Sequence, residues 1–226
     1  MQARMKNLLV VAHPDDETIF FTSAILNQPE YEWSIACVTD ANADGEGARR
    51  KSQFERACKE LKASQCYWFN LPDIYETRLN LDQIQSNLAK IPTPHHVYTH
   101  GPLGEYMHPH HQDVCYAVTK FYAPICPTYV TAYNAFPEKR FLLSKEQFEL
   151  RTHILSEIYS SETMRFINML PARSCDEFIM APLDEIEALY KLLAHHELKQ
   201  LDKLKIYKWL RYFLEEKANN PGSRPF

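Results

Sequence analysis

Short apolar runs alternate with segments of helical periodicity through the first 134 residues of this 226-residue chain. Runs such as Leu8–Ala12 and Trp33–Thr39 are apolar enough to form buried strands, and the spacing of Phe54, Ala57 and Leu61 is that of a helix. The pattern predicts strands near 6–13, 33–39, 66–69, 96–100 and 127–133, and helices near 17–26, 48–63, 81–88 and from 108 onward. Such alternation favours parallel strands joined by right-handed crossovers. We therefore predict an α/β fold, a Rossmann-like three-layer sandwich with a mainly parallel sheet.

The pattern changes after Asn134, where helical periodicity becomes dominant. Helices are expected over 143–166 and 186–213, with a short strand near 177–180 between them. We expect this C-terminal part to pack on the sheet, and the alternative is that it folds separately. The predicted organisation is one domain over 1–218, with a core of 6–134 and a helical C-terminal part of 143–214, followed by a flexible tail over 219–226.

The first strand is followed at once by residues 13–17, His-Pro-Asp-Asp-Glu. Pro14 disfavours a helical conformation at His13, so the strand ends there, and acidic residues suit the positive end of a helix that begins near Glu17. Open α/β sheets bind their ligands at such turns. A nucleotide-binding turn would carry glycines that let backbone amides approach a phosphate. One imidazole and three carboxylates repel phosphate and attract a cation.

A second polar cluster, residues 108–111 with the sequence His-Pro-His-His, lies where the fourth predicted strand leads into a helix. His108 and His111 have the same three-residue spacing as His13 and Asp16. A parallel sheet places all such junctions on one edge, so the two pairs can meet there. They would supply two histidines and a carboxylate with room for water, a ligand set typical of hydrolytic zinc.

Two further polar residues belong to the same predicted edge. Asp15 has no structural need to be acidic, and beside a metal-bound water its carboxylate would suit the role of general base. The alternative is that Asp15 only caps the helix. Arg50 begins the second predicted helix, where it is either a solvated surface residue or a contact for the substrate.

The remaining histidines are weaker candidates. His100 ends the fourth predicted strand, and it either lines the site or is structural. His110 neighbours two candidate ligands but points elsewhere on its helix, so we expect it to lie outside the site. Structural or solvent-facing positions are expected for His95, His96, His153, His195 and His196.

Composition limits the class of partner. The formal net charge is −4 and no Lys/Arg run extends beyond Arg49–Lys51, so nucleic acid is not the expected partner. No apolar run approaches the roughly 18 residues of a membrane span, and no signal-peptide pattern is present. We therefore expect a cytoplasmic protein. The six cysteines include no C-x-x-C pair and are expected to be reduced core residues.

Residues 11–17, Val-Ala-His-Pro-Asp-Asp-Glu, resemble the signature of the PIG-L (LmbE-like) family of zinc-dependent N-deacetylases. Residues 104–111, Gly-Glu-Tyr-Met-His-Pro-His-His, resemble the second motif of that family, which ends in His-Pro-x-His. The segment 39–61 has a weaker likeness to the part between the motifs. The resemblance spans about residues 6–123.

The resemblance implies a role for each site residue. The implied zinc ligands are His13, Asp16 and His111. Asp15 would be the catalytic base, His108 would stabilise the oxyanion, and Arg50 would approach the substrate. Members of the family act on N-acylated amino sugars and their conjugates.

Three departures from the family pattern stand out. The family usually has an acidic residue where His110 stands, a Glu at the position of Gln53, and a Gly at the positions of Met107 and Lys62. The first departure would alter the orientation of the ligands or the polarity of the pocket. None of the departures removes a ligand.

We predict a zinc-dependent amidohydrolase that removes the acetyl group from an N-acetylated amino sugar of the N-acetylglucosamine type, or from a glycoconjugate, by hydrolysing a linear amide C–N bond. The partner is then a small molecule, and the oligomeric state stays open. Another divalent transition metal would also suit the ligand set. The alternatives are an amidase that cleaves a larger conjugate amide and a metal-dependent sugar-binding protein without turnover.

Overall fold

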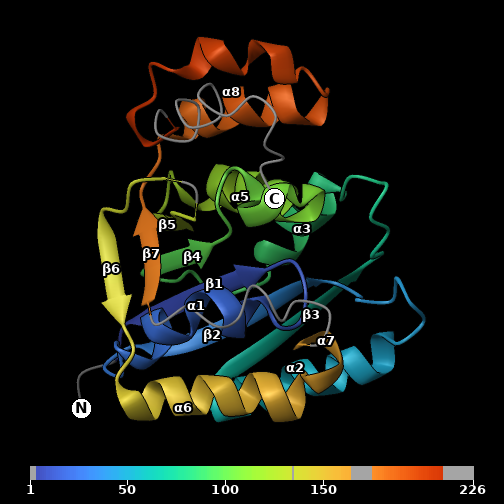
Figure 1. Cartoon of the computed structure of the whole chain (residues 1–226), viewed down its shortest axis with the longest axis vertical. Helices are drawn as coiled ribbons and strands as arrows, with labels where there is room; N and C mark the ends of the chain where they lie inside the picture. The colour runs from blue at the N-terminus through green and yellow to red at the C-terminus, as the bar shows by residue number, and fades with distance from the viewer. Residues whose placement is uncertain (1–3, 134, 164–174, 211–226) are drawn as a thin grey trace. The chain divides into compact units, whose positions relative to one another are not determined.

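The computed structural model describes residues 4–133, 135–163 and 175–210 (Figure 1). The predicted tail over 219–226 and the ends of both predicted C-terminal helices fall outside these residues. The chain divides into two compact units. Unit 1 comprises Met1–Asp73, Thr93–His96 and Arg140–Asp176, and unit 2 comprises Ile74–Pro92, Val97–Lys139 and Glu177–Phe226. The region predicted as one helical C-terminal part therefore contributes to both units.

Seven strands form a mostly parallel sheet in the order β3-β2-β1-β4-β5-β7-β6. The predicted α/β class with a mainly parallel sheet is confirmed. The strands are β1 (Lys6–Val11), β2 (Glu32–Thr39), β3 (Gln65–Leu71), β4 (His96–Thr99), β5 (Thr128–Thr131), β6 (Lys139–Leu142) and β7 (Cys175–Ile179).

Unit 1 is built on parallel pairing of β1 with β2 and of β2 with β3. Leu9 of β1 is in register with Ile35 of β2, and both side chains are fully buried. Burial of each such side chain contributes about 1.5–3 kcal/mol relative to an exposed position. The buried residues of β1 and β2 hold the polar turn that follows β1 in place.

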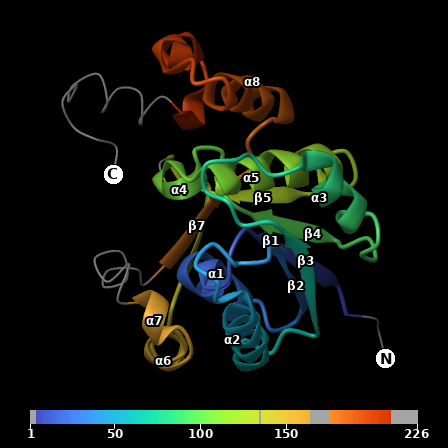
Figure 2. The same ribbon diagram turned by 90° about the vertical axis from the view of Figure 1, so that its right-hand side faces the viewer.

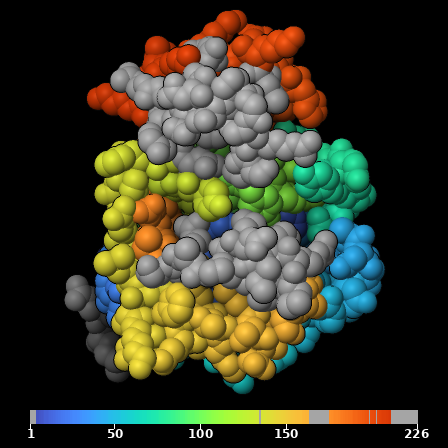
Figure 3. Space-filling view, viewed as in Figure 1, coloured from blue at the N-terminus to red at the C-terminus, as the bar shows by residue number. Residues whose placement is uncertain are grey.

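The helices of unit 1 cover these strands. They are α1 (Asp16–Leu26), α2 (Gly47–Glu60), α6 (Lys145–His153) with the π-helical turn Ile154–Ile158, and α7 (Ser160–Thr163). Helix α1 is buried almost all round because it packs against β1 and α6, as Figure 2 shows from the side. Helix α6, yellow in Figure 3, forms part of the outer surface of unit 1.

Unit 2 is built on β4 and β5, which pair in parallel, and on β7, which is antiparallel to β5. Its helices are α3 (Leu81–Leu88), α4 (Gly104–Met107), α5 (Pro109–Tyr122) and α8 (Leu183–Ala194), followed by the 3-10 helix Leu198–Leu204. Helix α5 packs against both α3 and α8. Cys115 of α5, Val130 of β5 and Leu189 of α8 meet in the core of this unit.

The helix predicted over 186–213 is shorter in the structure, where α8 ends at Ala194. His196 adopts a left-handed conformation with φ 55°. Its amide donates to the carbonyl of Leu193 (3.1 Å), and the amide of Glu197 donates to the carbonyl of Leu192 (2.8 Å). This is a Schellman C-cap built without glycine, so the end of the helix carries no glycine signal in the sequence.

The helix predicted over 143–166 is likewise divided, into α6, the π-helical turn and α7, and β6 was not predicted.

Among the residues that the structure describes, no helix combines the length and apolarity that crossing a membrane would require.

Candidate active site

The turn after β1 places three acidic residues at the start of α1. Asp15 is the N-cap residue and has φ 96° and ψ −30°, in the region that residues with a side chain rarely adopt. Its carbonyl accepts the first helical hydrogen bonds, from the amides of Thr18 (2.9 Å) and Ile19 (2.8 Å). Its carboxylate makes no capping hydrogen bond to the described backbone of the helix. Helix capping therefore does not explain why this residue is acidic.

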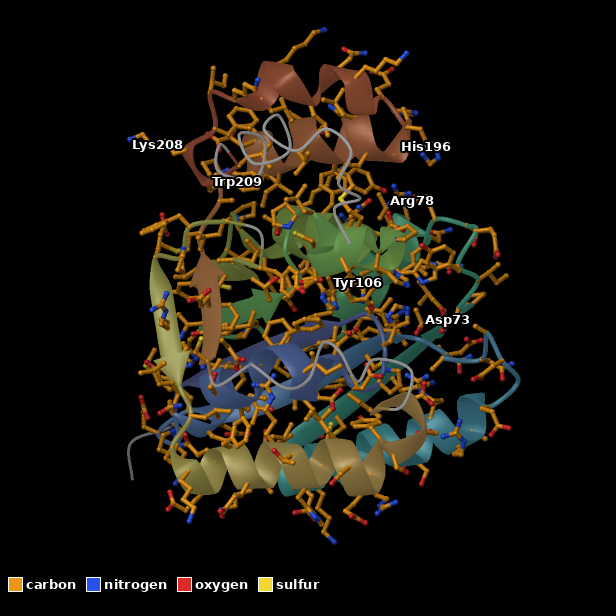
Figure 4. The ribbon with its side chains drawn as sticks, in the orientation of Figure 1. Asp73, Arg78, Tyr106, His196, Lys208 and Trp209 are labelled. Carbon is orange, nitrogen blue, oxygen red and sulfur yellow. The ribbon has the colours of Figure 1, made fainter. Side chains whose placement is uncertain are left out.

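His13 and Asp16 lie together in this turn. The backbone amide of His13 donates to Oδ2 of Asp16 (2.8 Å), and Nδ1 of the His13 ring lies 3.4 Å from the same oxygen. The other ring nitrogen, Nε2, lies 3.5 Å from Oδ1 of Asp73, which follows β3 and is labelled in Figure 4. Burial opposes the charged form of His13, but the two carboxylates outweigh it and raise its pKa to about 9. The turn thus stabilises positive charge.

Arg50 is buried beside Asp15 and is not at the surface. Its Nη2 donates to the carbonyl of Pro14 (2.7 Å) and lies 3.5 Å from Oδ2 of Asp15, while Nη1 donates to Oε2 of Glu162 (2.7 Å). Burial and repulsion from Asp16 raise the pKa of Asp15 well above its usual value, and Arg50 partly offsets them. The solvated-surface alternative is excluded, whereas contact of Arg50 with a substrate stays a prediction.

Glu17 supports the unusual backbone of Asp15. Its Oε2 accepts from the amide of Asp15 (3.1 Å), and Oε1 accepts from the hydroxyls of Thr18 (2.6 Å) and Tyr159 (2.9 Å). Burial raises the pKa of Glu17 to about 7. The third acidic residue of the motif is therefore structural, since all three bonds hold the turn.

In unit 2, His111 lies in the first turn of α5 and is fully buried. Its Nδ1 lies 2.6 Å from Oε2 of Glu105, the carboxylate that also accepts from the amide of Gly101 (2.8 Å) and from the hydroxyl of Thr131. Burial disfavours the charged form of Glu105, but His100 and His111 outweigh it and hold its pKa well below the usual range. An ionised acceptor at Nδ1 places the ring proton there, so that Nε2 is the nitrogen able to ligate a metal.

His100 belongs to the same cluster. Its Nδ1 lies 2.9 Å from Oε2 of Glu105, and its ring stacks on that of His111 with centroids 3.9 Å apart. His100 thus lies beside the candidate ligand His111 and shares its carboxylate partner, Glu105.

His108 is the N-cap residue of α5, and His110 follows it in the first turn. Nδ1 of His108 accepts from the backbone amide of His110 (3.2 Å), so the proton of a neutral His108 ring lies on Nε2. The His108 ring is stacked on that of His111 (4.7 Å between centroids) and meets Tyr75 edge-on (5.1 Å). His108 is therefore arranged as a hydrogen-bond donor through Nε2.

The His110 ring meets the His108 ring edge-on, with centroids 5.2 Å apart. Its buried Nε2 lies 3.1 Å from the carbonyl oxygens of both Ile74 and Thr77, and it therefore ties the start of α5 to the loop before α3. The expectation that His110 lies outside the ligand set stays a prediction.

Three carboxylates of these clusters were not predicted from the sequence. Glu105 lies inside the 104–111 motif, and its spacing of six residues from His111 was a signal that could have been used. Asp73 and Glu162 have no such signal, since they are distant in sequence from His13 and Arg50, the residues that they contact. The predicted ligands themselves come from both units: His13 and Asp16 from unit 1, and His111 from unit 2.

Comparison with known proteins adds an independent observation. A family model described as PIG-L, GlcNAc-PI de-N-acetylase, matches residues 8–122. A probable N-acetylglucosaminyl-phosphatidylinositol de-N-acetylase from Dictyostelium discoideum is 38% identical over 64 residues, which are 27% of this chain and 25% of that protein. The uncharacterized protein L374 of Acanthamoeba polyphaga mimivirus is 23% identical over 176 residues, 71% of this chain and 73% of that protein.

Among solved structures, the N,N'-diacetylchitobiose deacetylase from Pyrococcus horikoshii has a similar fold. The TM-score is 0.64 at 20% identity, and the likeness covers 80% of this chain and 85% of that one. The fold, the two polar clusters and a family match over more than half of the sequence agree with one another. The chain belongs to the PIG-L family, described as GlcNAc-PI de-N-acetylases.

Proposed function

We propose that the protein is a zinc-dependent N-deacetylase that hydrolyses the acetamide of an N-acetylated amino sugar or glycoconjugate. Family membership and the deacetylase fold neighbour support N-deacetylase activity. The observation that carries the proposal is the chemistry of the turn after β1. It combines a histidine, a neighbouring carboxylate and a second carboxylate, that of Asp15, which makes no capping hydrogen bond to the described backbone of the helix.

The proposed zinc ligands are His13, Asp16 and His111. Donors bound at about 2.0–2.1 Å to a tetrahedral zinc lie about 3.3 Å apart, and Nδ1 of His13 is 3.4 Å from Oδ2 of Asp16. Metal-ligating histidines usually present their second nitrogen to a carboxylate. His13 has Asp73 in that position and His111 has Glu105. The residues present therefore fit the metal.

Bound zinc would lower the pKa of a water ligand from about 15.7 to about 7 and would polarise the amide carbonyl. Asp15 would act as general base, taking one proton from the attacking water and returning it to the leaving nitrogen as the amide C–N bond breaks. Nε2 of His108 would donate a hydrogen bond to the developing oxyanion. The products are acetate and a free amino sugar.

Hydrogen bonds from neighbouring groups hold Asp15 and His108 in position. Arg50 and Glu17 hold the backbone on both sides of Asp15, through the carbonyl of Pro14 and the amide of Asp15. The amide of His110 fixes the tautomer of His108. Fixed donors and acceptors of this kind are what electrostatic stabilisation of a transition state requires.

Two similar proteins support the proposed substrate class: a probable de-N-acetylase of N-acetylglucosaminyl-phosphatidylinositol and a deacetylase of N,N'-diacetylchitobiose. Both of those substrates contain an N-acetylated glucosamine unit. We therefore place the acetamide of such a unit at Asp15 and His108.

The proposal is tested by incubating purified full-length protein with a panel of N-acetylglucosamine conjugates and measuring acetate and free amine. We expect equal amounts of both products, loss of the reaction after chelation and its return on addition of zinc. Release of an acid other than acetate would indicate a larger-amide amidase. Tight sugar binding with no acetate from any conjugate would indicate a binding protein.

A further inference from the structure

Unit 2 contains a cavity of about 360 Å³. Its walls are the loop Tyr75–Arg78, the segment around Pro109 and the C-terminal end of α8, including Ala194 and His196. Arg78 and His196 are labelled in Figure 4. The volume lies at the lower end of the range of about 300–1,000 Å³ that small-molecule sites occupy. The cavity is therefore suited to a small ligand or to one part of a larger one.

The cavity adjoins His108. Met107 and Pro109, the residues on either side of His108, both line it, and the ring of Tyr75 on its wall contacts the His108 ring. A molecule whose acetamide reaches His108 would therefore extend its next group into this cavity. The assigned roles of Asp15 and His108 do not use this space.

The walls are held in place by hydrogen bonds that are buried or partly buried. Asp113 of α5 accepts from the amide of Leu79 (2.9 Å) and from the hydroxyl of Tyr190 on α8 (2.8 Å). Nη1 of Arg78 lies 3.0 Å from the carbonyl oxygen of Pro109. Loop, α5 and α8 are thus joined by one network, and the cavity exists before any ligand enters.

The charge of the cavity does not favour an anion. Its one guanidinium, that of Arg78, is paired with Asp113 at 3.1 Å, and Glu76 adds a carboxylate to the wall. With histidines counted as neutral, these residues carry no excess of positive charge. Among the described residues, the bonds of Arg78 use Nη1, so its Nε and Nη2 are the donors that can meet a hydroxyl.

The remaining lining suits a sugar ring. The Tyr75 side chain is 59% exposed and offers an aromatic surface, while Thr77, Gln112 and His196 supply polar groups. A site with aromatic surface and a few placed polar groups binds a ring with one apolar face and several hydroxyls.

We infer that this cavity is a subsite for a neutral sugar ring joined to the acetylated amino sugar, with Tyr75, Arg78 and the end of α8 as its specificity-determining parts. The inference rests on the proposed function for the placement of the acetylated unit. It gives the C-terminal helix α8 a role, which is to form the wall that selects the second ring.

Two variants test the subsite. Tyr75→Ala removes the aromatic surface, and Ala194→Trp fills the cavity from the α8 side; both positions are partly exposed, so the fold should tolerate them. Phe136→Ala is the control, because Phe136 is a 79% exposed aromatic residue of unit 2 that does not line the cavity. The measured quantity is the ratio of kcat/KM for the β-1,4-linked N-acetylglucosamine disaccharide to that for N-acetylglucosamine.

We expect this ratio to fall by about tenfold in Tyr75→Ala and in Ala194→Trp and to be unchanged in Phe136→Ala. A ratio within twofold of the parent value in both variants would overturn the inference while leaving deacetylation intact.

Calorimetric titration with cellobiose, a neutral disaccharide without an acetamide, separates the two proposals. We expect binding to the parent and to Phe136→Ala, and binding weakened by about tenfold in Ala194→Trp. This pattern in a protein that releases no acetate would support the subsite and contradict the proposed function. Absence of cellobiose binding, or binding of inorganic phosphate that Ala194→Trp abolishes, would overturn the subsite.

Discussion

Asp15 begins α1 with φ 96°, a conformation that costs about 1–3 kcal/mol for a residue other than glycine. The surrounding residues maintain it, because Glu17 binds the amide of Asp15 and Arg50 binds the carbonyl of Pro14. The Asp15 carboxylate makes no hydrogen bond to the described amides of the helix, and the backbone that carries it is held next to Asp16. We infer that the strain is retained for the position of this carboxylate.

His108 and His111 have different surroundings although they are three residues apart. Nδ1 of His111 faces an ionised carboxylate, whereas Nδ1 of His108 accepts from a backbone amide. The first arrangement increases the basicity of a metal ligand, and the second leaves a donor at Nε2. This difference supports the roles that the family resemblance implied for the two residues.

Replacing His108 or His111 by alanine should have different effects on zinc content and on kcat. His111→Ala should lose most of its bound zinc, because two protein ligands seldom hold the metal. His108→Ala should keep near-normal zinc content while kcat falls by about 10²–10³, the effect of removing one oxyanion donor. Elemental analysis measures the zinc content of both variants, and initial rates give their kcat. Loss of zinc from His108→Ala with zinc retained in His111→Ala would exchange their roles.

Local motifs allowed most of the residue-level picture to be predicted. The turn at 13–17 and the cluster at 108–111 are contiguous, so their spacing could be read directly from the sequence. Asp73 could not be found, because its contact with His13 depends on where β3 ends and on the path of the following loop. The burial of Arg50 depends on Glu162 of α7, which is more than 100 residues away.

At the scale of elements, the start of α5 is tied to the loop before α3. His110, which stands where the family usually has an acidic residue, contacts two backbone carbonyls of that loop through one ring nitrogen. A neutral or charged imidazole can donate to a carbonyl, whereas an ionised carboxylate cannot. The departure from the family pattern therefore gives this chain a loop anchor that holds Tyr75 near His108.

Replacing His110 by alanine should leave the carbonyls of Ile74 and Thr77 without this donor. We expect the free energy of unfolding to fall by about 1–3 kcal/mol, with zinc content near normal. Urea unfolding of the two proteins measures the change. The control is His153→Ala, which removes an exposed histidine at the end of α6 and should change stability little. Equal stability of the His110 and His153 variants would show that the anchor is unimportant.

The order of the elements in the first 134 residues was predictable because apolar runs and helical periodicity are local signals. The end of α8 could not be predicted, because His196 occupies the left-handed position where a glycine usually marks the end of a helix. The π-helical turn at Ile154–Ile158 also lacks a sequence signal, and it divides a segment whose periodicity predicts one helix.

At the scale of the whole molecule, the proposed ligands come from distant segments and from both compact units. The proposed ligand set needs residues of both units, since neither unit alone supplies two histidines and an aspartate from it. The general base, Asp15, distinguishes an enzyme from a protein that only binds a metal and a sugar. Its replacement is accordingly the decisive experiment.

That measurement is acetate release by zinc-loaded Asp15→Asn beside the parent, with zinc per chain determined for both. Asn caps helices as well as Asp and tolerates a left-handed backbone, but it cannot accept the proton. We predict equal zinc content and folding, with turnover lower by about 10²–10⁴. Hydrolysis of a verified substrate by Asp15→Asn at close to the parent rate would contradict the assignment of Asp15 as general base and, with it, the proposed mechanism.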